Sequence, residues 1–222
     1  MSNFQSQPLL AWHFLRKGGV TRDGQTVTVG SRMHVNPPVI MGERELHASL
    51  RLLDALRYTS FSPVACRVRM SGEIIKGSDK IVATDREVLA MVDATKILHE
   101  FACVVAEEAL QKAGVTDKRS WNVIALKRRW LSGDDNDREF SAAKAAAREA
   151  AEADWRVDRK ASASRAAKAA AKAAVWAADL AAESAAFEAV SSVLEGFRGE
   201  EFEAERSRLN DILTRMVEEA LL

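Results

Sequence analysis

A stretch of 62 residues without glycine or proline, from Asp134 to Glu195, constrains the fold of this chain more than any other feature. Alanine makes up 23 of the 45 residues between positions 142 and 186. Alanine loses no side-chain entropy on entering a helix and has the highest intrinsic helix propensity, so the stretch predicts helix. A single helix of this length would extend about 93 Å. Because helices gain most of their stability from packing, we expect it to fold back near residues 132–137 and 158–164.

Larger side chains recur every three or four residues in the second half of this stretch, which is the spacing of one face of a helix. Small alanine side chains let two helices approach closely, so these larger residues would anchor the packing. After Gly196 and Gly199 a second amphipathic pattern, from Phe202 to Leu221, predicts a final helix. The anchoring stripe of the first pattern consists of Trp176, Leu180, Ser184, Phe187, Ser191 and Leu194.

Charge is segregated along these predicted helices. Between Arg156 and Lys172 there are six basic residues and one acidic residue, whereas between Val193 and Leu222 there are eight acidic residues and four arginines. An antiparallel helical hairpin in which the two regions meet would place opposite charges beside the apolar seam. The same faces could instead join two copies of the chain in a homodimer, and the sequence leaves both arrangements open.

The first half of the chain has a different character, because all four prolines and eight of the eleven glycines precede residue 115. We expect strands at 9–15 and 63–70, a hairpin-like element at 26–29, a helix at 49–58 capped by Ser49, and a helix from Asp93 to Gly114. The predicted fold class is therefore α+β. A small mixed domain, residues 1–116, would precede an alanine-rich helical domain, residues 117–222, with a hairpin or three helices.

Composition narrows the possible environment and partners. The 32 basic and 32 acidic residues give no net charge, so any attraction to nucleic acid or to a membrane must be local. Cys66 and Cys103 lack the spacing of metal ligands or of a redox pair, which suits a reducing compartment. The first residues lack a basic segment before their short apolar run, and no run of apolar residues is long enough to span a bilayer. We expect a cytoplasmic protein that does not associate with membranes.

His47 is the single residue most suggestive of chemistry. It could act as a general base or as a hydrogen-bond donor to a ligand, with Asp79 and Lys80 nearby in the fold. The alternative is a structural role in which His47 hydrogen-bonds a turn or caps the following helix. Gly77-Ser78-Asp79-Lys80 has the composition of a turn. The sequence contains no phosphate-binding glycine motif and no zinc-ligand spacing, so we expect no cofactor, no metal site and no assigned catalytic residue.

The segment from Lys118 to Trp130 combines five basic residues with two tryptophans, a mixture that can contact nucleic acid through phosphates and stacking, and Arg165, Lys168 and Lys172 offer a second basic helical face. Trp121, in contrast, lies at helical spacing with Ile124 and Ala125, which favours packing. The predicted partner-binding residues are Lys127, Arg128, Arg129, Trp130, Arg165, Lys168 and Lys172.

The first half also resembles an uncharacterised domain family that is common in phage and prophage genomes and often carries an alanine-rich helical tail. The resemblance implies a phage or mobile-element origin but no mechanism. We therefore expect a non-enzymatic binding protein that engages a host protein or ribonucleoprotein, most concretely an anti-defence protein such as an anti-CRISPR inhibitor. A nucleic-acid-binding accessory protein and an enzyme centred on His47 are the alternatives. The motifs that carry the resemblance are Leu46-His47-Ala48-Ser49, Leu53-Asp54-Ala55-Leu56-Arg57-Tyr58, Cys66-Arg67-Val68, Ser71-Gly72-Glu73-Ile74, Asp79-Lys80-Ile81-Val82-Ala83, Asp93-Ala94-Thr95 and Leu98-His99-Glu100-Phe101-Ala102.

Overall fold

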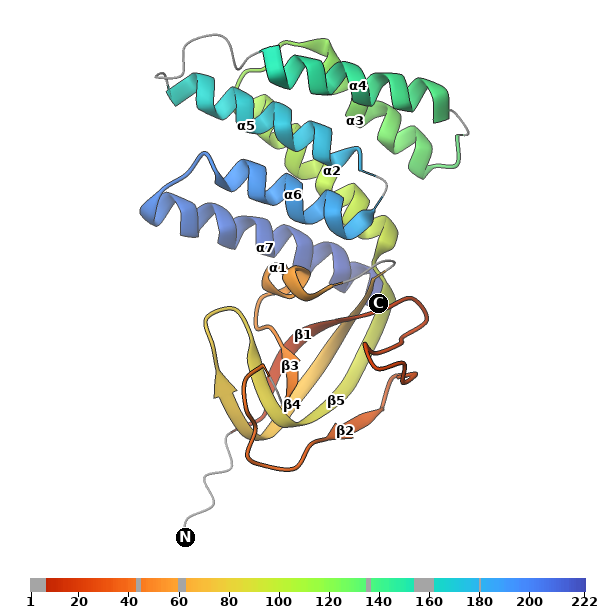
Figure 1. Cartoon of the computed structure of the whole chain (residues 1–222), viewed down its shortest axis with the longest axis vertical. Helices are drawn as coiled ribbons and strands as arrows, with labels where there is room; N and C mark the ends of the chain where they lie inside the picture. Colours follow the sequence, from red (N-terminus) through yellow and green to blue (C-terminus); the bar gives the residue numbers. More distant parts are fainter. Residues whose placement is uncertain (1–6, 43–44, 60–62, 135–136, 154–161, 180) are drawn as a thin grey trace. The chain divides into compact units, whose positions relative to one another are not determined.

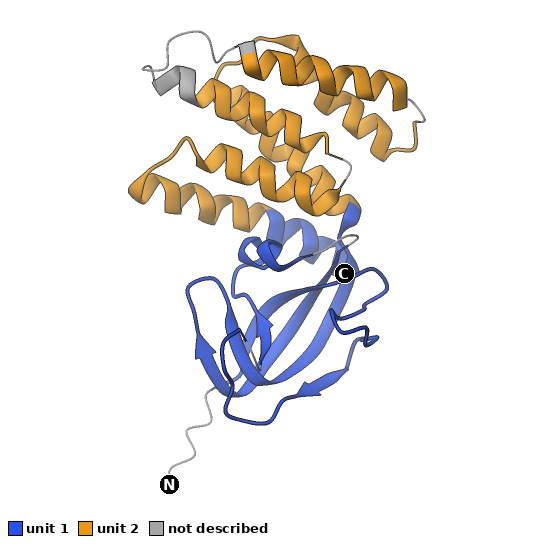
Figure 2. Ribbon diagram, in the orientation of Figure 1, with its two compact units in different colours: residues 1–95, 213–222 blue, residues 96–212 orange. Residues whose placement is uncertain are grey.

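The chain has an α+β fold in which a five-stranded antiparallel sheet is followed by several packed helices (Figure 1). It divides into two compact units, which are coloured separately in Figure 2. The first unit comprises residues 1–95 and 213–222, and the second comprises residues 96–212. The computed structural model describes residues 7–42, 45–59, 63–134, 137–153, 162–179 and 181–222.

The sheet of the first unit is built around one long hairpin. Strands β4 (Val64–Lys76) and β5 (Ile81–Asp93) pair along their length and are joined by the turn at residues 77–80. Strand β1 (Leu9–Leu15) pairs with β4, and β2 (Arg32–His34) and β3 (Leu46–Ala48) pair with different parts of β5. The strands predicted at 9–15 and 63–70 are confirmed, and β4 continues beyond the prediction to Lys76.

A bulge bends β4 against β5 near Gly72. The pairing register shifts between Ser71 and Ile74, and Gly72 has a φ of +79°. A Cβ atom at this position would collide with the side chains of Thr84 and Asp85 on β5, so only glycine fits. The core of the sheet consists of Ala11, Leu15, Val27, Ala48, Val64, Cys66, Val68, Met70, Ile81, Ala83 and Val88.

Two local predictions for the first unit were wrong. The helix expected at 49–58 is confined to α1 (Leu52–Ala55) and a 3₁₀ turn (Leu56–Tyr58). Ser49 does not cap it, because the backbone of Ser49 exchanges two hydrogen bonds of 2.8 Å with Trp12 and so extends the sheet. The hairpin-like element expected at 26–29 is present at its start, because Thr26 forms an antiparallel bridge with Val20 and the backbone N–H of Val27 donates to the carbonyl of Gly19 at 2.8 Å.

Helix α2 (Thr95–Lys112) confirms the helix predicted from Asp93, whose carboxylate accepts a hydrogen bond from the backbone N–H of Thr95. From residue 96 onwards α2 belongs to the second unit, where Glu108 pairs with Arg208 at 2.7 Å. The boundary expected between residues 116 and 117 therefore falls inside a compact unit. The other helices are α3 (Lys118–Leu131), α4 (Asp137–Ala153), α5 (Ser162–Ala177), α6 (Ala182–Leu194) and α7 (Gly199–Leu221), of which α7 reaches into the first unit.

The alanine-rich interval does fold back near residues 132–137, between α3 and α4, as expected. Most of the second expected reversal, at 158–164, lies outside the described residues. A further break after Ala177 was not predicted, and it divides the expected stripe between α5 and α6; Leu180 of that stripe is not described. Hydrogen bonds to Asp179 explain the break. Its carboxylate accepts a hydrogen bond from the Ser184 hydroxyl, and its backbone carbonyl accepts one from the Lys127 ammonium group.

Helices α5 and α6 form a helical hairpin, but it turns after Ala177, whereas the expected hairpin paired the alanine-rich helix with the segment after Gly196 and Gly199. Alanine side chains from both helices are almost fully buried within the one chain, among them Ala173, Ala177 and Ala185. One bond of the predicted kind joins the basic and acidic regions, from Lys172 Nζ to Glu195 Oε1 at 2.8 Å. The acidic side chain of Glu205 in α7 instead pairs with Lys112 and Arg208.

Candidate functional site

Charged side chains of the first unit gather at the β4–β5 turn. Lys80 Nζ lies 2.7 Å from Glu45 Oε1, and the Tyr58 hydroxyl donates to Asp79 Oδ2 at 2.8 Å. Arg57 Nη1 also contacts Asp79 Oδ2, at 3.2 Å. We call these five residues the turn cluster. The turn itself is closed by a backbone hydrogen bond from Gly77 to Lys80, as its composition predicted.

His47 borders the turn cluster from strand β3. Its Nδ1 is 3.8 Å from Glu45 Oε1, and its ring centroid is 5.5 Å from that of Tyr58. His13 lies on its other side, at 4.9 Å between centroids. Burial, assisted by the nearby charge of Arg86, lowers the pKa of His47 to about 4, so the imidazole is neutral at pH 7. The structure thus brings His47 into the neighbourhood of the turn that carries Asp79 and Lys80, and it places His47 in a strand and not at a helix cap.

The chemistry available to this arrangement is hydrogen bonding. Burial, together with the bond to Asp79, raises the pKa of Tyr58 to about 12, so its phenol keeps its proton. The two cysteines are not suited to act as nucleophiles, because each is buried and burial raises the pKa of both thiols to about 12. A neutral imidazole and a phenol beside two ion pairs suit the recognition of polar groups better than nucleophilic attack.

Apolar side chains are exposed on segments next to the same turn: Ile75 precedes it on β4, Tyr58 bonds to its Asp79, and Ile40 precedes Met41 in the chain. Ile40, Met41, Tyr58 and Ile75 have exposed fractions between 37% and 45%. Met41 lies against the turn, since its Cε would be 3.2 Å from a Cβ atom at Gly77. We call these four residues the hairpin patch. The hairpin patch could not be predicted, because nothing in the sequence shows that the segments near residues 40, 58 and 75 lie next to one turn.

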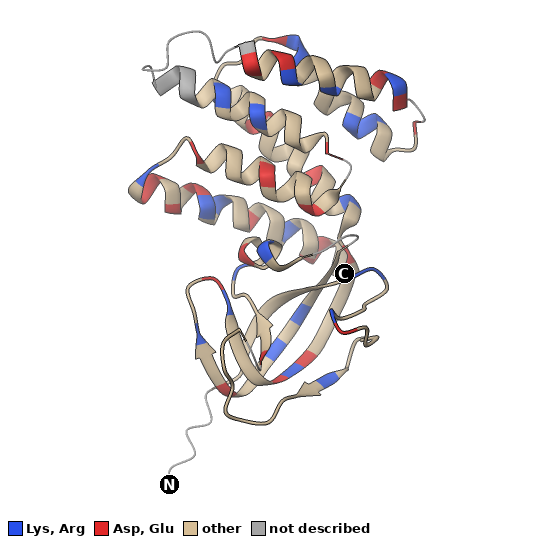
Figure 3. Cartoon of the chain, in the orientation of Figure 1, with Lys and Arg blue, Asp and Glu red and all other residues tan. Residues whose placement is uncertain are grey.

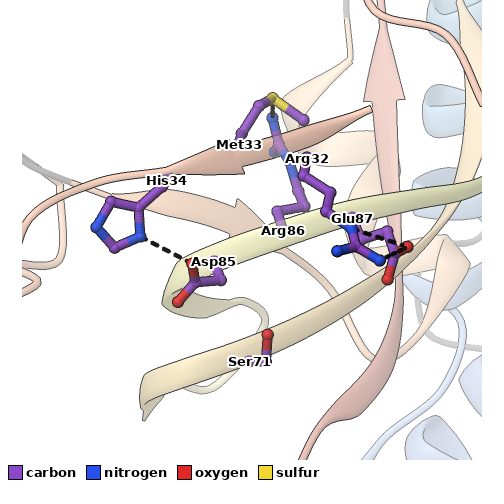
Figure 4. Close-up of a pocket in the computed structure, with 7 residues that line it drawn as sticks. All are labelled: Arg32, Met33, His34, Ser71, Asp85, Arg86 and Glu87. Atoms are coloured by element: carbon purple, nitrogen blue, oxygen red, sulfur yellow. Dashed lines mark hydrogen bonds and ion pairs between the residues drawn. The ribbon is translucent and has the colours of Figure 1, made fainter. Parts of the chain in front are cut away.

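An open pocket of about 350 Å³ lies on the first unit where β2, β4 and β5 run side by side (Figure 4). Direct cross-strand pairing places Arg32 opposite Glu87 and His34 opposite Asp85. His34 Nδ1 is 2.8 Å from Asp85 Oδ1, and Arg32 donates through Nε and Nη2 to Glu87 Oε1. The alternation of charged residues at 32 and 34 and at 85 and 87 was visible in the sequence, but the register that pairs them was not.

Arg86 also lines this pocket and is 5% exposed. Its Nη1 donates to the carbonyl of His47 at 2.9 Å, and its Nη2 lies 3.3 Å from the sulfur of Met33. Burial lowers the pKa of Arg86 to about 10. A buried guanidinium is expensive to desolvate, and both of these acceptors are uncharged.

Lys127, predicted to contact a partner, lies inside the second unit and is 0% exposed. Its ammonium group donates to the carbonyl of Asp179 at 2.7 Å and lies 4.0 Å from the centroid of the Trp130 ring. The expectation that Lys127 lies on an accessible basic face was therefore wrong. The aromatic rings of Trp130 and Phe140 and the carbonyl compensate for the loss of water around the cation.

The other predicted partner-binding residues of α3 are engaged within the chain. Arg128 pairs with Glu100 and Glu107, and Arg129 pairs with Asp134 and Glu139. Trp130 stacks on Phe140 with ring centroids 6.3 Å apart and meets His99 edge to face.

On α5, Lys168 is half-buried and Lys172 pairs with Glu195, while the side chain of Arg165 lies outside the described residues. Figure 3 shows basic and acidic residues interspersed along the helices. The seven predicted residues therefore do not form one continuous basic surface among the side chains that the structure describes.

Within the described ranges, no group of three or more histidine, cysteine, aspartate or glutamate side chains is placed to hold a metal ion. The same part of the chain contains no helix with the length and apolar character needed to cross a bilayer. No protein-family model, no curated protein and no solved structure matches this chain.

Proposed function

We propose that this chain is a non-enzymatic, phage-encoded binding protein that engages a host macromolecule in the cytoplasm through the hairpin patch. The observation that carries the proposal is the distribution of exposed apolar side chains. Among the residues whose exposure is described, every well-exposed large apolar side chain belongs to the first unit, and four of them lie on segments next to one turn. Exposed apolar groups that gather at one place are typical of protein interaction sites.

The hairpin patch is held in place before any partner binds. Tyr58 is anchored through its hydroxyl on Asp79, and the turn beneath Met41 is closed by the bond between Gly77 and Lys80. A side chain that is already ordered loses less entropy when a partner covers it. Tyrosine also combines a large apolar surface with few rotatable bonds, which is why it contributes strongly to protein interfaces.

The ion pair between Arg57 and Asp79 provides accessible polar groups beside the hairpin patch, and the pair between Lys80 and Glu45 lies largely buried. Arg57 is 55% exposed at its side chain, whereas Lys80 and Glu45 are 17% and 10% exposed. A protein partner would therefore meet an apolar centre bordered by groups that hydrogen-bond, which is the usual composition of a transient interface. The resemblance to a phage domain family favours a host defence component as that partner, and inhibition of a CRISPR effector is the specific form we propose.

Protection of a phage from host defence tests this function directly. The chain would be expressed in a bacterium whose CRISPR system targets a phage, and the plating efficiency of that phage would be measured. We expect the wild-type chain to restore plating and the double variant Tyr58→Ser, Ile75→Ser to lose the effect, because two apolar contacts are removed. Val29→Ser is the matched control, since Val29 is 60% exposed and is not part of the hairpin patch.

Thermal unfolding of the purified variants must accompany this assay. Equal midpoints for the double variant and the control would assign any loss of protection to binding and not to unfolding. Protection that survives the double variant would contradict the proposed surface. Absence of protection by the wild-type chain against every defence system supplied would contradict the anti-defence role.

A further inference from the structure

The pocket on β2, β4 and β5 is bordered by an arrangement of charge that the hairpin patch does not explain. Arg69, Glu87 and Arg32 lie in one row across the three strands, because Glu87 is the direct partner of Arg69 on one side and of Arg32 on the other. Side chains of directly opposed residues project from the same face of a sheet. The next row places Asp85 between Ser71 and His34 in the same way.

One carboxylate in the first row serves two guanidinium groups. Arg32 donates to Glu87 Oε1 at 3.1 and 3.2 Å, and Arg69 donates to Oε2 at 2.6 Å. Hydrogen bonds from Arg32, and to a smaller extent from Arg69, hold the pKa of Glu87 below its ordinary value, so this carboxylate is ionised at pH 7. A guanidinium carries more N–H donors than a single carboxylate oxygen can accept. The row is thus left with an excess of positive charge and of donors, held in a fixed orientation.

Arg86 adds positive charge from the opposite face of the sheet, because it alternates with Asp85 and Glu87 along β5 and pairs with Met33. Within the described part of the chain its hydrogen bonds go to a carbonyl and a thioether, and its Nε is buried without a hydrogen-bond partner. On the pocket face the guanidiniums of Arg32 and Arg69 therefore balance the carboxylates of Asp85 and Glu87, and Arg86 contributes its charge from the other side of the sheet. A buried cation without a carboxylate in contact is stabilised by an anion bound nearby.

We propose that this face of the sheet binds a nucleoside phosphate, with the phosphate on Arg32, which lines the pocket, and on Arg69, which borders it through its bond to Glu87. Arginine is suited to this role because its planar fork matches phosphate oxygens. A pocket of about 350 Å³ is larger than a bare ion needs and lies within the range of small-molecule sites. Asp85 and Ser71 lie beside the row and accept hydrogen bonds from hydroxyl or amino groups, which a nucleoside supplies. The ligand is either a free nucleotide or one nucleotide of a single strand.

Binding of three probes to the full chain distinguishes these sources. Adenosine monophosphate and adenosine would be titrated calorimetrically, and a labelled oligoadenylate of about ten nucleotides would be followed by fluorescence anisotropy. The test variant is Arg32→Gln, whose side chain is 79% exposed and so is not needed for folding. The control is Arg22→Gln, which removes an exposed arginine of the same unit outside the pocket.

We expect the phosphate-bearing probes to bind and adenosine not to bind. Arg32→Gln should weaken binding about tenfold because a charge-assisted hydrogen bond is lost, whereas Arg22→Gln should leave it within about twofold. Binding of the monophosphate would assign the site to free nucleotides, and binding of the oligonucleotide alone, with the same dependence on Arg32, would assign it to a strand. The proposal is overturned if no phosphate-bearing probe binds, if adenosine binds equally well, or if both variants weaken binding alike.

Because the pocket and the hairpin patch involve different residues, the two proposals fail independently. If both proposals are correct, the Tyr58→Ser, Ile75→Ser variant loses protection but binds nucleotide as the wild-type chain does. Conversely, Arg32→Gln should weaken nucleotide binding and leave protection unchanged.

Discussion

Lys127 and Trp130 form a cation–π pair inside the helical unit, with the Lys127 ammonium nitrogen 4.0 Å from the centroid of the indole ring. The two residues lie three positions apart on α3, so one turn of helix brings them together. The same ammonium donates to the carbonyl of Asp179, at the break between α5 and α6. One buried cation thus joins α3 to the turn that divides the alanine-rich helices.

The pair predicts that stability depends on pH through Lys127. Burial lowers the pKa of this lysine from 10.5 to about 8. Between these values the unfolded chain holds a proton that the folded chain releases, so this residue makes the free energy of unfolding rise with pH, by at most about 1.4 kcal/mol per pH unit. Urea unfolding between pH 7 and pH 10 measures this rise, and Lys127→Met should lack it. Equal pH slopes for the two proteins would contradict the lowered pKa.

The glycine of the β4 bulge leads to a second prediction. Gly72→Ala should destabilise the chain by about 2–4 kcal/mol, because the new Cβ meets Thr84 and Asp85 and the backbone has a positive φ. Gly30→Ala is the control: its φ is +87°, but no atom lies within 4 Å of the added Cβ, so a cost of about 1 kcal/mol is expected from backbone strain alone. Chemical denaturation compares the two. Similar losses would mean that steric contact with β5 is unimportant.

Much of the fold was predictable because it depends on local pattern. A short apolar run located β1, the alternation of apolar and basic residues located the first part of β4, and alanine content together with the absence of breakers located the helices. The break after Ala177 was missed because it depends on a bond between residues that are distant in the chain, Lys127 and Asp179. Intrinsic propensity alone favours a continuous helix there, and a tertiary contact overrides it.

The candidate sites were less predictable for the same reason. His47 was singled out correctly as a neighbour of the Asp79–Lys80 turn, but the partners that surround it, Glu45 and Tyr58, come from other segments. The pocket depends on the register of β2 against β5, which three residues of β2 do not specify in the sequence. Lys127 was placed on the wrong side of its helix because a lysine is rarely fully buried.

Two basic residues of the helical unit, Arg208 and Lys172, should differ in how much their ion pairs contribute to stability. Arg208 bridges Glu108 and Glu205, and the side chain of Glu205 is only 10% exposed. Arg208→Met should cost about 1–2 kcal/mol because it leaves a largely buried carboxylate with fewer donors. Lys172→Met breaks an exposed pair with Glu195 and should cost less than about 0.5 kcal/mol. Equal losses in thermal unfolding would show that burial of the carboxylate is irrelevant.

The two thiols should be unreactive in the folded chain. Cys66 and Cys103 are each 0% exposed, and burial raises the pKa of both to about 12, so neither thiolate nor access is available near pH 8. A thiol reagent such as dithionitrobenzoate should therefore release almost no colour from the native protein and should report both cysteines in guanidinium chloride.

The rate of the slow native reaction measures how often each core opens. Cys66→Ala and Cys103→Ala variants then separate the opening of the sheet unit from that of the helical unit, because each leaves one thiol to report on its own core. Rapid labelling of either single thiol under native conditions would contradict the packing around it.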